Sequence, residues 1–213
     1  MRVSSGWSAA ALAAAALAAL AVEGCARSSS NTSYAGRLLA ERAAKDAAFR
    51  TSADSPIPPD RRAEFLPLAY FPPDETCVAP ASLAPIEPAQ TLTVEMPTST
   101  GTRRLMRRVG MLQFMLKGQS LRLTAFVEAN ESGAQPLFVP FTDLTTGTET
   151  YAAGRYLELE PTPTGIYTID FNRAFNPFCH YNPAYDCPFP PAENRLQLPI
   201  RAGERVKAPP KQP

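Results

Sequence analysis

The sequence of 213 residues has one histidine, one tryptophan and only 19% charged residues. A single histidine excludes most zinc sites and the iron sites that need two histidines. The formal net charge of +1 provides no long-range field of the kind that attracts a protein to nucleic acid. We therefore predict no metal, no cofactor and no nucleic-acid partner.

The sequence also has no apolar run long enough to span a membrane as a helix. Its clearest such run, from Ala9 to Val22, has 14 residues, whereas a spanning helix needs about 20. The run follows the basic residue Arg2 and precedes small residues, which is the pattern of a signal peptide. Residues 1–24 are therefore interpreted as a leader, and we expect the protein to be exported.

Cys25 follows this leader directly. The segment from Val22 to Cys25 resembles the bacterial lipobox, where a signal peptidase cleaves before a cysteine that carries lipid. Residues 25–33 would then be a short polar tether to the membrane. We predict a membrane-anchored lipoprotein of the bacterial envelope; cleavage after Ala26 is the alternative and would give a secreted or periplasmic protein.

Proline is abundant, with 23 residues spread between short hydrophobic runs, as in a loop-rich globular domain. We assign residues 34–205 to a single domain and residues 206–213 to a disordered tail. Strong helix formers predict one helix over residues 34–50. Its apolar stripe is weak, so this helix is expected at the edge of the domain.

Alternating apolar residues between turn-forming residues indicate β-strands over most of the remaining chain. The predicted strands are 91–96, 111–116, 121–127, 136–141, 156–160, 166–171 and 196–200. With no helix between them, they predict a mainly β fold, an antiparallel β-sandwich or flattened barrel with one N-terminal helix. The strand at 136–141 is expected at an edge, because Pro140 has no amide to donate.

The strands at 156–160 and 166–171 flank a short PTPTG turn and predict a hairpin. Strand alternation then places one set of apolar residues on the core face: Leu157, Leu159, Tyr167, Ile169 and Phe171. Arg155 has the same parity, so its guanidinium points toward the apolar layer and needs an acidic partner. Asp143 and Glu149, in the preceding turn, are the candidates.

Residues 170–195 form a long irregular segment near the C-terminus, rich in proline, asparagine and aromatic residues. Cys179 and Cys187 lie in it with a spacing wider than zinc sites use, in a protein that we expect in an oxidising compartment. We predict a disulfide between them; two reduced and packed thiols are the alternative. Cys77 is expected to be a small buried hydrophobic residue.

Polar residues on turns and strand ends of the C-terminal half form the candidate ligand site. They are Asp143, Thr145, Glu149, Tyr151, Arg155, Asp170, Asn172, Arg173, Asn176, Glu193 and Asn194. In a structural interpretation, carboxylates pair with the arginines and the amides satisfy local backbone. In a functional one, the arginines hold an anionic ligand in a pocket and aromatic rings stack on it.

Several segments with a specific order and spacing carry a resemblance to a known family. They are DLTTGTETYAAGRYL (143–157), DFNRAFNP (170–177), CPFPPAENRL (187–196) and AGE (202–204), with Arg42, Lys45, Asp46 and Phe49 upstream. The chain resembles the bacterial and archaeal family catalogued as domain of unknown function 1684 over roughly residues 40–205. The resemblance implies no activity.

Two function classes follow from these observations. The first is a non-enzymatic envelope module that binds a small anionic ligand or an envelope protein, with the membrane reached through lipid on Cys25. The second is a hydrolase or lyase in which Asp143, Glu149 or Asp170 acts as acid or base. Carboxylates that are dry and locked onto arginines would favour the first class.

Overall fold

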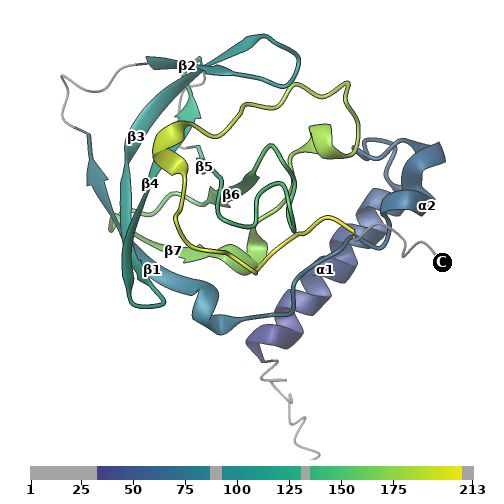
Figure 1. Cartoon of the computed structure of the whole chain (residues 1–213), viewed down its shortest axis with the longest axis horizontal. Helices are drawn as coiled ribbons and strands as arrows, with labels where there is room; N and C mark the ends of the chain where they lie inside the picture. Colours follow the sequence, from purple (N-terminus) through teal and green to yellow (C-terminus); the bar gives the residue numbers. More distant parts are fainter. Residues whose placement is uncertain (1–32, 87–92, 131–134, 208–213) are drawn as a thin grey trace, which may run out of the picture. The chain divides into compact units, whose positions relative to one another are not determined.

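The protein is represented by a computed structural model that describes residues 33–86, 93–130 and 135–207 (Figure 1). The predicted leader, Cys25 and nearly all of the tether lie outside these residues. Val206 still donates to the Glu149 carbonyl at 3.1 Å, so the ordered domain continues through this residue. No helix of the described ranges has the length and apolar character needed to cross a membrane.

Helix α1 spans Tyr34–Thr51, as predicted, and Ser33 caps its start by accepting the Gly36 amide at 3.1 Å. Only Leu38 and Arg42 of this helix are buried. The Arg42 guanidinium donates to the Phe71 carbonyl at 2.8 Å. Polar contacts therefore attach α1 to the domain, as the weak apolar stripe indicated. Two short helical segments follow, the 3-10 turn Pro59–Arg61 and α2, Arg62–Phe65.

Seven strands form one antiparallel sheet that curls into a half-barrel (Figure 1), which confirms the mainly β prediction. The strands are β1 (Val78–Pro85), β2 (Thr93–Pro97), β3 (Arg103–Leu116), β4 (Gln119–Glu128), β5 (Leu137–Phe141), β6 (Arg155–Leu159) and β7 (Ile166–Asp170). Their order is β6-β5-β4-β3-β1-β7, and β2 pairs with the outer half of β3.

The predicted strands 111–116 and 121–127 pair as a hairpin at the centre of the sheet. Lys117 and Gly118 adopt positive φ angles of 48° and 76° in a two-residue turn, as type I′ hairpins require. A bulge follows Arg108, and a Cβ at Gly110 would lie 2.7 Å from the Ala84 carbonyl oxygen. Glycine at this position therefore allows β1 to lie directly against β3.

The hairpin predicted from residues 156–160 and 166–171 is wrong. β6 pairs with β5 and β7 pairs with β1, so the two strands lie at opposite ends of the sheet order. The predicted core face is nevertheless right, because Leu157, Leu159, Tyr167, Ile169 and Phe171 are all buried. Alternation within a strand fixed that face without information on which partner the strand has.

Two further strand predictions differ from the structure. The strand at 136–141 is not at an edge, because β5 lies between β4 and β6; Pro140 is tolerated since β5 and β4 pair only at Phe138 and Phe126. Residues 196–200 bury Leu196, Leu198 and Ile200 but form no strand. β1 was missed because its prolines, Pro80 and Pro85, argue against a strand.

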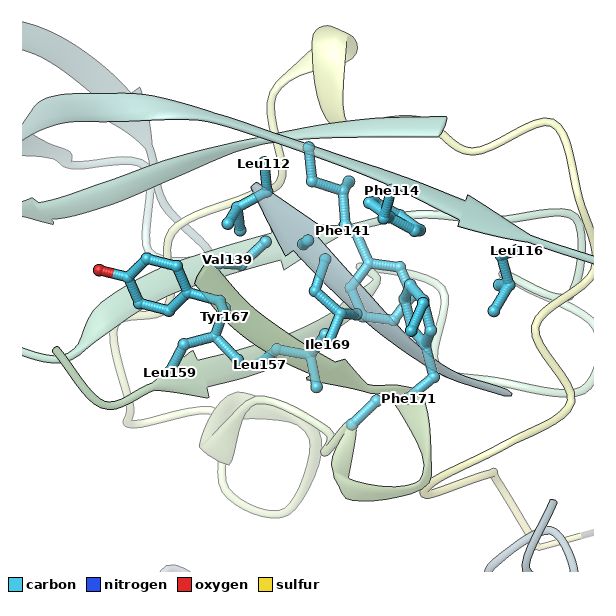
Figure 2. Close-up of a cluster of buried hydrophobic side chains, with 14 of the residues drawn as sticks. Leu112, Phe114, Leu116, Val139, Phe141, Leu157, Leu159, Tyr167, Ile169 and Phe171 are labelled. Carbon is cyan, nitrogen blue, oxygen red and sulfur yellow. The ribbon is translucent and has the colours of Figure 1, made fainter. Parts of the chain in front are cut away.

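The main core fills the concave side of the sheet (Figure 2). Leucine, isoleucine, valine and aromatic side chains from β3, β5, β6 and β7 meet there, and Figure 2 shows Phe141 and Ile169 between them. Cys77 is fully buried in this core, as predicted. Residues that follow β7, among them Phe171, Leu196 and Ile200, complete this core.

Candidate functional site

Arg155 and Asp143 form the most buried ion pair of the predicted site. Nη2 of Arg155 lies 2.9 Å from Oδ2 of Asp143, and both side chains are 1% exposed. The same guanidinium donates to the carbonyls of Ile200, Ala202 and Glu204. Burial lowers the pKa of Arg155, and Asp143 opposes this effect. Asp143 is therefore the acidic partner that the sequence required, and the guanidinium has no surface to offer a ligand.

The turn around Asp143 is closed by its own hydrogen bonds. Oδ1 of Asp143 accepts the amide and the hydroxyl of Thr145 at 2.8 and 2.6 Å, and the Thr145 hydroxyl lies 3.0 Å from that of Thr150. Glu149 lies apart from them, 2.8 Å from the exposed Arg201, which lowers the pKa of the Glu149 carboxyl. The two candidate carboxylates of this turn do not face each other across a cleft.

Asp170, Asn172 and Arg173 lie together at the end of β7, against helix α1. Oδ1 of Asp170 caps the short 3-10 helix Phe171–Arg173 by accepting the Asn172 amide at 3.0 Å. Arg173 pairs with Asp170 at 3.1 Å and with Glu41 of the helix. Their hydrogen bonds attach the N-terminal helix to the sheet.

Asn176, Glu193 and Asn194 lie at three separate places. The backbone amide of Asn176 donates to the Glu204 carboxylate at 2.7 Å, and the exposed Glu193 pairs with Arg108 at 3.0 Å. The Asn194 side chain is fully buried between β4 and β5. It bonds the backbone of both strands where their own pairing is sparse.

Glu204 is a buried carboxylate that the sequence did not single out. It accepts the Tyr181 hydroxyl at 2.7 Å and pairs with Lys45 of α1 at 2.6 Å. It thereby joins the C-terminal segment, the irregular loop and the helix. The sequence shows Glu204 in the AGE motif, but not that it is buried, because its burial depends on contacts between segments that are distant in the chain. Each of these predicted polar residues therefore has a hydrogen bond or ion pair within the domain.

Residues 175–188 of the irregular segment lie over the face of β5 and β6 that points away from the main core. Phe175 exchanges backbone hydrogen bonds with Tyr156 of β6, and the Phe189 amide donates to the Pro97 carbonyl at 2.8 Å. Phe178 packs edge-on to Tyr185 within the segment, with ring centroids 5.3 Å apart. These contacts, and not a covalent bridge, hold its shape.

The predicted disulfide is not formed, because Cys179 and Cys187 are both free, buried thiols. They are neighbours nonetheless, and the Cys179 amide donates to the Cys187 sulfur at 3.1 Å. The Tyr151 hydroxyl lies 3.9 Å from the Cys179 sulfur. The alternative of reduced, packed thiols describes this structure.

The two thiols differ in acidity. Hydrogen bonds from Cys187 foremost, and from Tyr151 and Ser99, stabilise a Cys179 thiolate and lower the pKa of Cys179. The same pairing and burial raise the pKa of Cys187. The pair is therefore expected to lose its first proton with a pKa below the usual cysteine range, because the remaining thiol donates a hydrogen bond to the thiolate.

Titration of thiolate absorbance near 240 nm is expected to show one cysteine ionising below the ordinary pKa of about 8.5. Cys179→Ser should remove this low-pH step, and Cys187→Ser should move it upward because the main donor is lost. Cys77→Ser is the matched control, since burial raises the pKa of Cys77. A step unchanged in both loop variants would contradict the assignment.

A cavity of about 420 Å³ lies between the irregular segment and the face of β5 and β6 opposite the main core; we call it the aromatic pocket. Phe138, Tyr156 and Glu158 line it from β5 and β6 and alternate with the core residues Val139 and Leu157. The loop supplies the opposite wall. Its lining residues include Phe175, Phe178, Tyr185, Asp186, Cys187 and Pro188.

The sequence did not predict this pocket. Arg104 and Glu128 lie outside the predicted strands 111–116 and 121–127, and Glu158 lies in a strand whose partner was predicted wrongly. The aromatic richness of residues 170–195 was the one signal that pointed to it. Of the predicted candidate residues that the structure describes, Cys187 alone lines the cavity.

Potential metal ligands lie apart from one another in the described part of the chain. In the ranges that the structure describes, no group of three or more histidine, cysteine and carboxylate side chains is arranged to bind a metal ion. The lone histidine, His180, lies edge-on to Phe65 and Tyr181, and burial lowers its pKa.

Comparison with known proteins places the chain in a family. Residues 63–205 match the family described as "Protein of unknown function (DUF1684)". The chain is also similar to an uncharacterized protein of Haloarcula marismortui with a solution NMR structure, at 40% identity and a TM-score of 0.63, over 80% of this chain and 92% of that one. No curated protein matches the chain. With two thirds of its length inside the match, including the β-sheet and the aromatic pocket, the chain belongs to the DUF1684 family of proteins of unknown function.

Proposed function

We propose that this protein is a non-catalytic binding module whose ligand site is the aromatic pocket. The observation that carries the proposal is a cavity of about 420 Å³ lined by five aromatic rings, with charged side chains among its lining residues. Cavities of about 300 to 1,000 Å³ with such a lining are typical of small-molecule sites. The loop that closes the pocket packs on itself and on the sheet, which supports a preformed site.

The anionic ligand expected from the sequence depended on free arginines. Arg155 is enclosed by Asp143 and three carbonyls, and Arg173 is shared by Glu41 and Asp170. Both cations are therefore already neutralised by carboxylates of the same domain. This supports a ligand in the aromatic pocket over one at the predicted polar site.

The hydrolase or lyase alternative has weaker support. Each of its three candidate carboxylates has an arginine partner: Asp143 has Arg155, Glu149 has Arg201 and Asp170 has Arg173. General acid catalysis needs a carboxyl whose pKa is raised toward neutrality, whereas Arg201 lowers the pKa of Glu149. The geometry therefore favours binding over catalysis.

The envelope location is part of the same proposal. It is supported by the apolar run of residues 9–22 and by the cysteine of the lipobox-like segment. Lipid on Cys25 would tether the domain by the few residues that precede Ser33. A tethered module of this kind would take up a small ligand, or meet an envelope partner, close to the membrane.

Binding can be tested with N-phenyl-1-naphthylamine, a neutral probe that fluoresces in apolar sites. The full chain with Cys25→Ser, which cannot carry lipid, is expected to bind one probe per molecule with saturation. Pro136→Trp should abolish the signal, because Pro136 is exposed at the edge of the pocket and indole would fill the entrance.

Pro163→Trp is the matched control, since Pro163 is equally exposed but does not line the pocket. It should bind the probe like the parent chain. Absence of saturable binding to the parent chain would refute the proposal. Equal binding by both tryptophan variants would move the site elsewhere.

A further inference from the structure

The aromatic pocket carries more negative than positive charge. One guanidinium and three carboxylates line it, those of Arg104, Glu128, Glu158 and Asp186. Nη1 of Arg104 lies 3.3 Å from Glu128, and its Nη2 donates to the Asp186 carbonyl at 2.8 Å. Arg104 is therefore offset by Glu128, and two carboxylates remain to act on a ligand.

These two carboxylates differ in their surroundings. The side chain of Asp186 accepts the hydroxyls of Thr100 and Thr102 at 2.6 and 2.9 Å, which lower its pKa to about 2. Asp186 thus stays ionised at any physiological pH. Glu158 is exposed on β6, and its carboxylate has no hydrogen bond or ion pair with any residue that the structure describes.

Glu158 also stands beside the rings. It lies opposite Phe138 in the register of β5 and β6, on the same face of the sheet as Tyr156. A carboxylate that is free of partners and borders an apolar cavity attracts a cation. The cationic lining residue, Arg104, is already paired with Glu128, so it offers an anion no comparable partner.

The aromatic rings that line the pocket include two perpendicular pairs. Phe138 and Tyr156 are 4.7 Å apart at 77°, and Phe178 and Tyr185 are 5.3 Å apart at 74°. The negative face of an aromatic ring attracts cations, and quaternary ammonium groups are the ligands that several such rings bind together.

We propose that the ligand of the aromatic pocket is a small quaternary ammonium compound, whose methyl groups contact the rings and whose charge is balanced by Glu158. This inference rests on the proposed function and specifies its ligand class. A quaternary ammonium group has no N–H donors. It can therefore leave water for a site lined by rings without losing hydrogen bonds that the rings would not replace.

Calorimetric titration with choline and with 3,3-dimethyl-1-butanol, its neutral isostere, tests the charge requirement on the Cys25→Ser chain. Choline is expected to bind about tenfold more tightly, because only the charged compound gains from the ring faces. Glu158→Gln should reduce choline affinity about threefold, as expected for an exposed charge pair, and leave the isostere unchanged. Glu160→Gln, exposed but outside this pocket, should alter neither.

The rings can be tested with a second matched pair. Phe178 lines the pocket and is 40% exposed, whereas Phe189 is 37% exposed and does not line it. Phe178→Leu keeps the apolar surface but removes a ring, so choline affinity should fall about threefold while binding of the isostere is kept. Phe189→Leu should bind both compounds as the parent chain does.

Two results would overturn the inference in different ways. If the naphthylamine probe binds but choline and its isostere bind equally, the pocket is a ligand site without preference for a cation. If neither the probe nor choline binds, the proposed function fails together with the inference.

Discussion

Arg155→Lys is expected to destabilise the protein by about 3 kcal/mol or more, because it disrupts a buried charge pair and leaves buried acceptors without donors. The guanidinium donates to Asp143 and to the carbonyls of Ile200, Ala202 and Glu204 in a site that is 1% exposed. A lysine ammonium keeps the charge but lacks the planar fork that reaches these acceptors. Urea unfolding followed by circular dichroism measures the loss.

Arg173→Lys is the control for this experiment. Its side chain is half exposed and pairs with Glu41 and Asp170 at the surface, so the expected cost is below about 1 kcal/mol. A fully stable Arg155→Lys variant that fails to bind ligand would reverse our interpretation. It would make Arg155 part of a binding site and not a structural contact.

The need for a partner at Arg155 was visible in the sequence. Parity with Leu157 and Leu159 placed the guanidinium in the apolar layer, and the cost of an unpaired buried charge then demanded a nearby carboxylate. The choice between Asp143 and Glu149 was not decidable, because both lie in one turn. The turn folds inward at Asp143, whose oxygen also accepts the Ile200 amide at 3.2 Å, and Glu149 remains outside with Arg201.

Strand positions were predictable, but the partners of β6 and β7 were not. Alternation identified the buried residues of β6 and β7, since side-chain direction is a local property of a strand. Their pairing with β5 and β1 depends on contacts across the whole chain. β1 was missed because its prolines argue against a strand. The contact between β4 and β5 depends on the side-chain amide of Asn194, which hydrophobic periodicity does not reveal.

The pocket could not be predicted for a related reason. Its rings come from β5, β6 and the irregular loop, and a cavity exists only where these surfaces fail to fill the space between them. Composition showed that residues 170–195 are rich in aromatic residues, but it did not indicate that these rings would hold the segment. The cysteines were interpreted as a covalent closure, whereas hydrogen bonds to β2 and β6 and ring contacts already close the segment.

Asn194→Asp is expected to destabilise the fold by about 3 kcal/mol at neutral pH, because a carboxylate would replace a buried donor. Nδ2 of Asn194 donates to the Thr124 carbonyl at 2.9 Å and to the Pro140 carbonyl at 2.7 Å, and Oδ1 accepts the Thr124 amide at 2.7 Å. The substitution would keep the acceptor but turn a negative oxygen toward two carbonyls. β4 and β5 would then lose the amide that substitutes for their missing strand pairing.

The effect of pH distinguishes this mechanism from a simple loss of packing. Repulsion by the two carbonyls and burial would raise the pKa of the new carboxyl in the folded state above its unfolded value of about 3.9. The penalty is therefore full above the folded pKa and shrinks as pH falls through it, since the protonated acid can donate again. Stability of the variant relative to the parent chain should improve on acidification, measured by urea unfolding at successive pH values.

Asn182→Asp is the control, because the side chain of Asn182 only accepts the Ala184 amide, at 3.0 Å, and aspartate accepts equally well. A pH-independent penalty at Asn194 would mean that shape, and not the lost donor, is what the position requires.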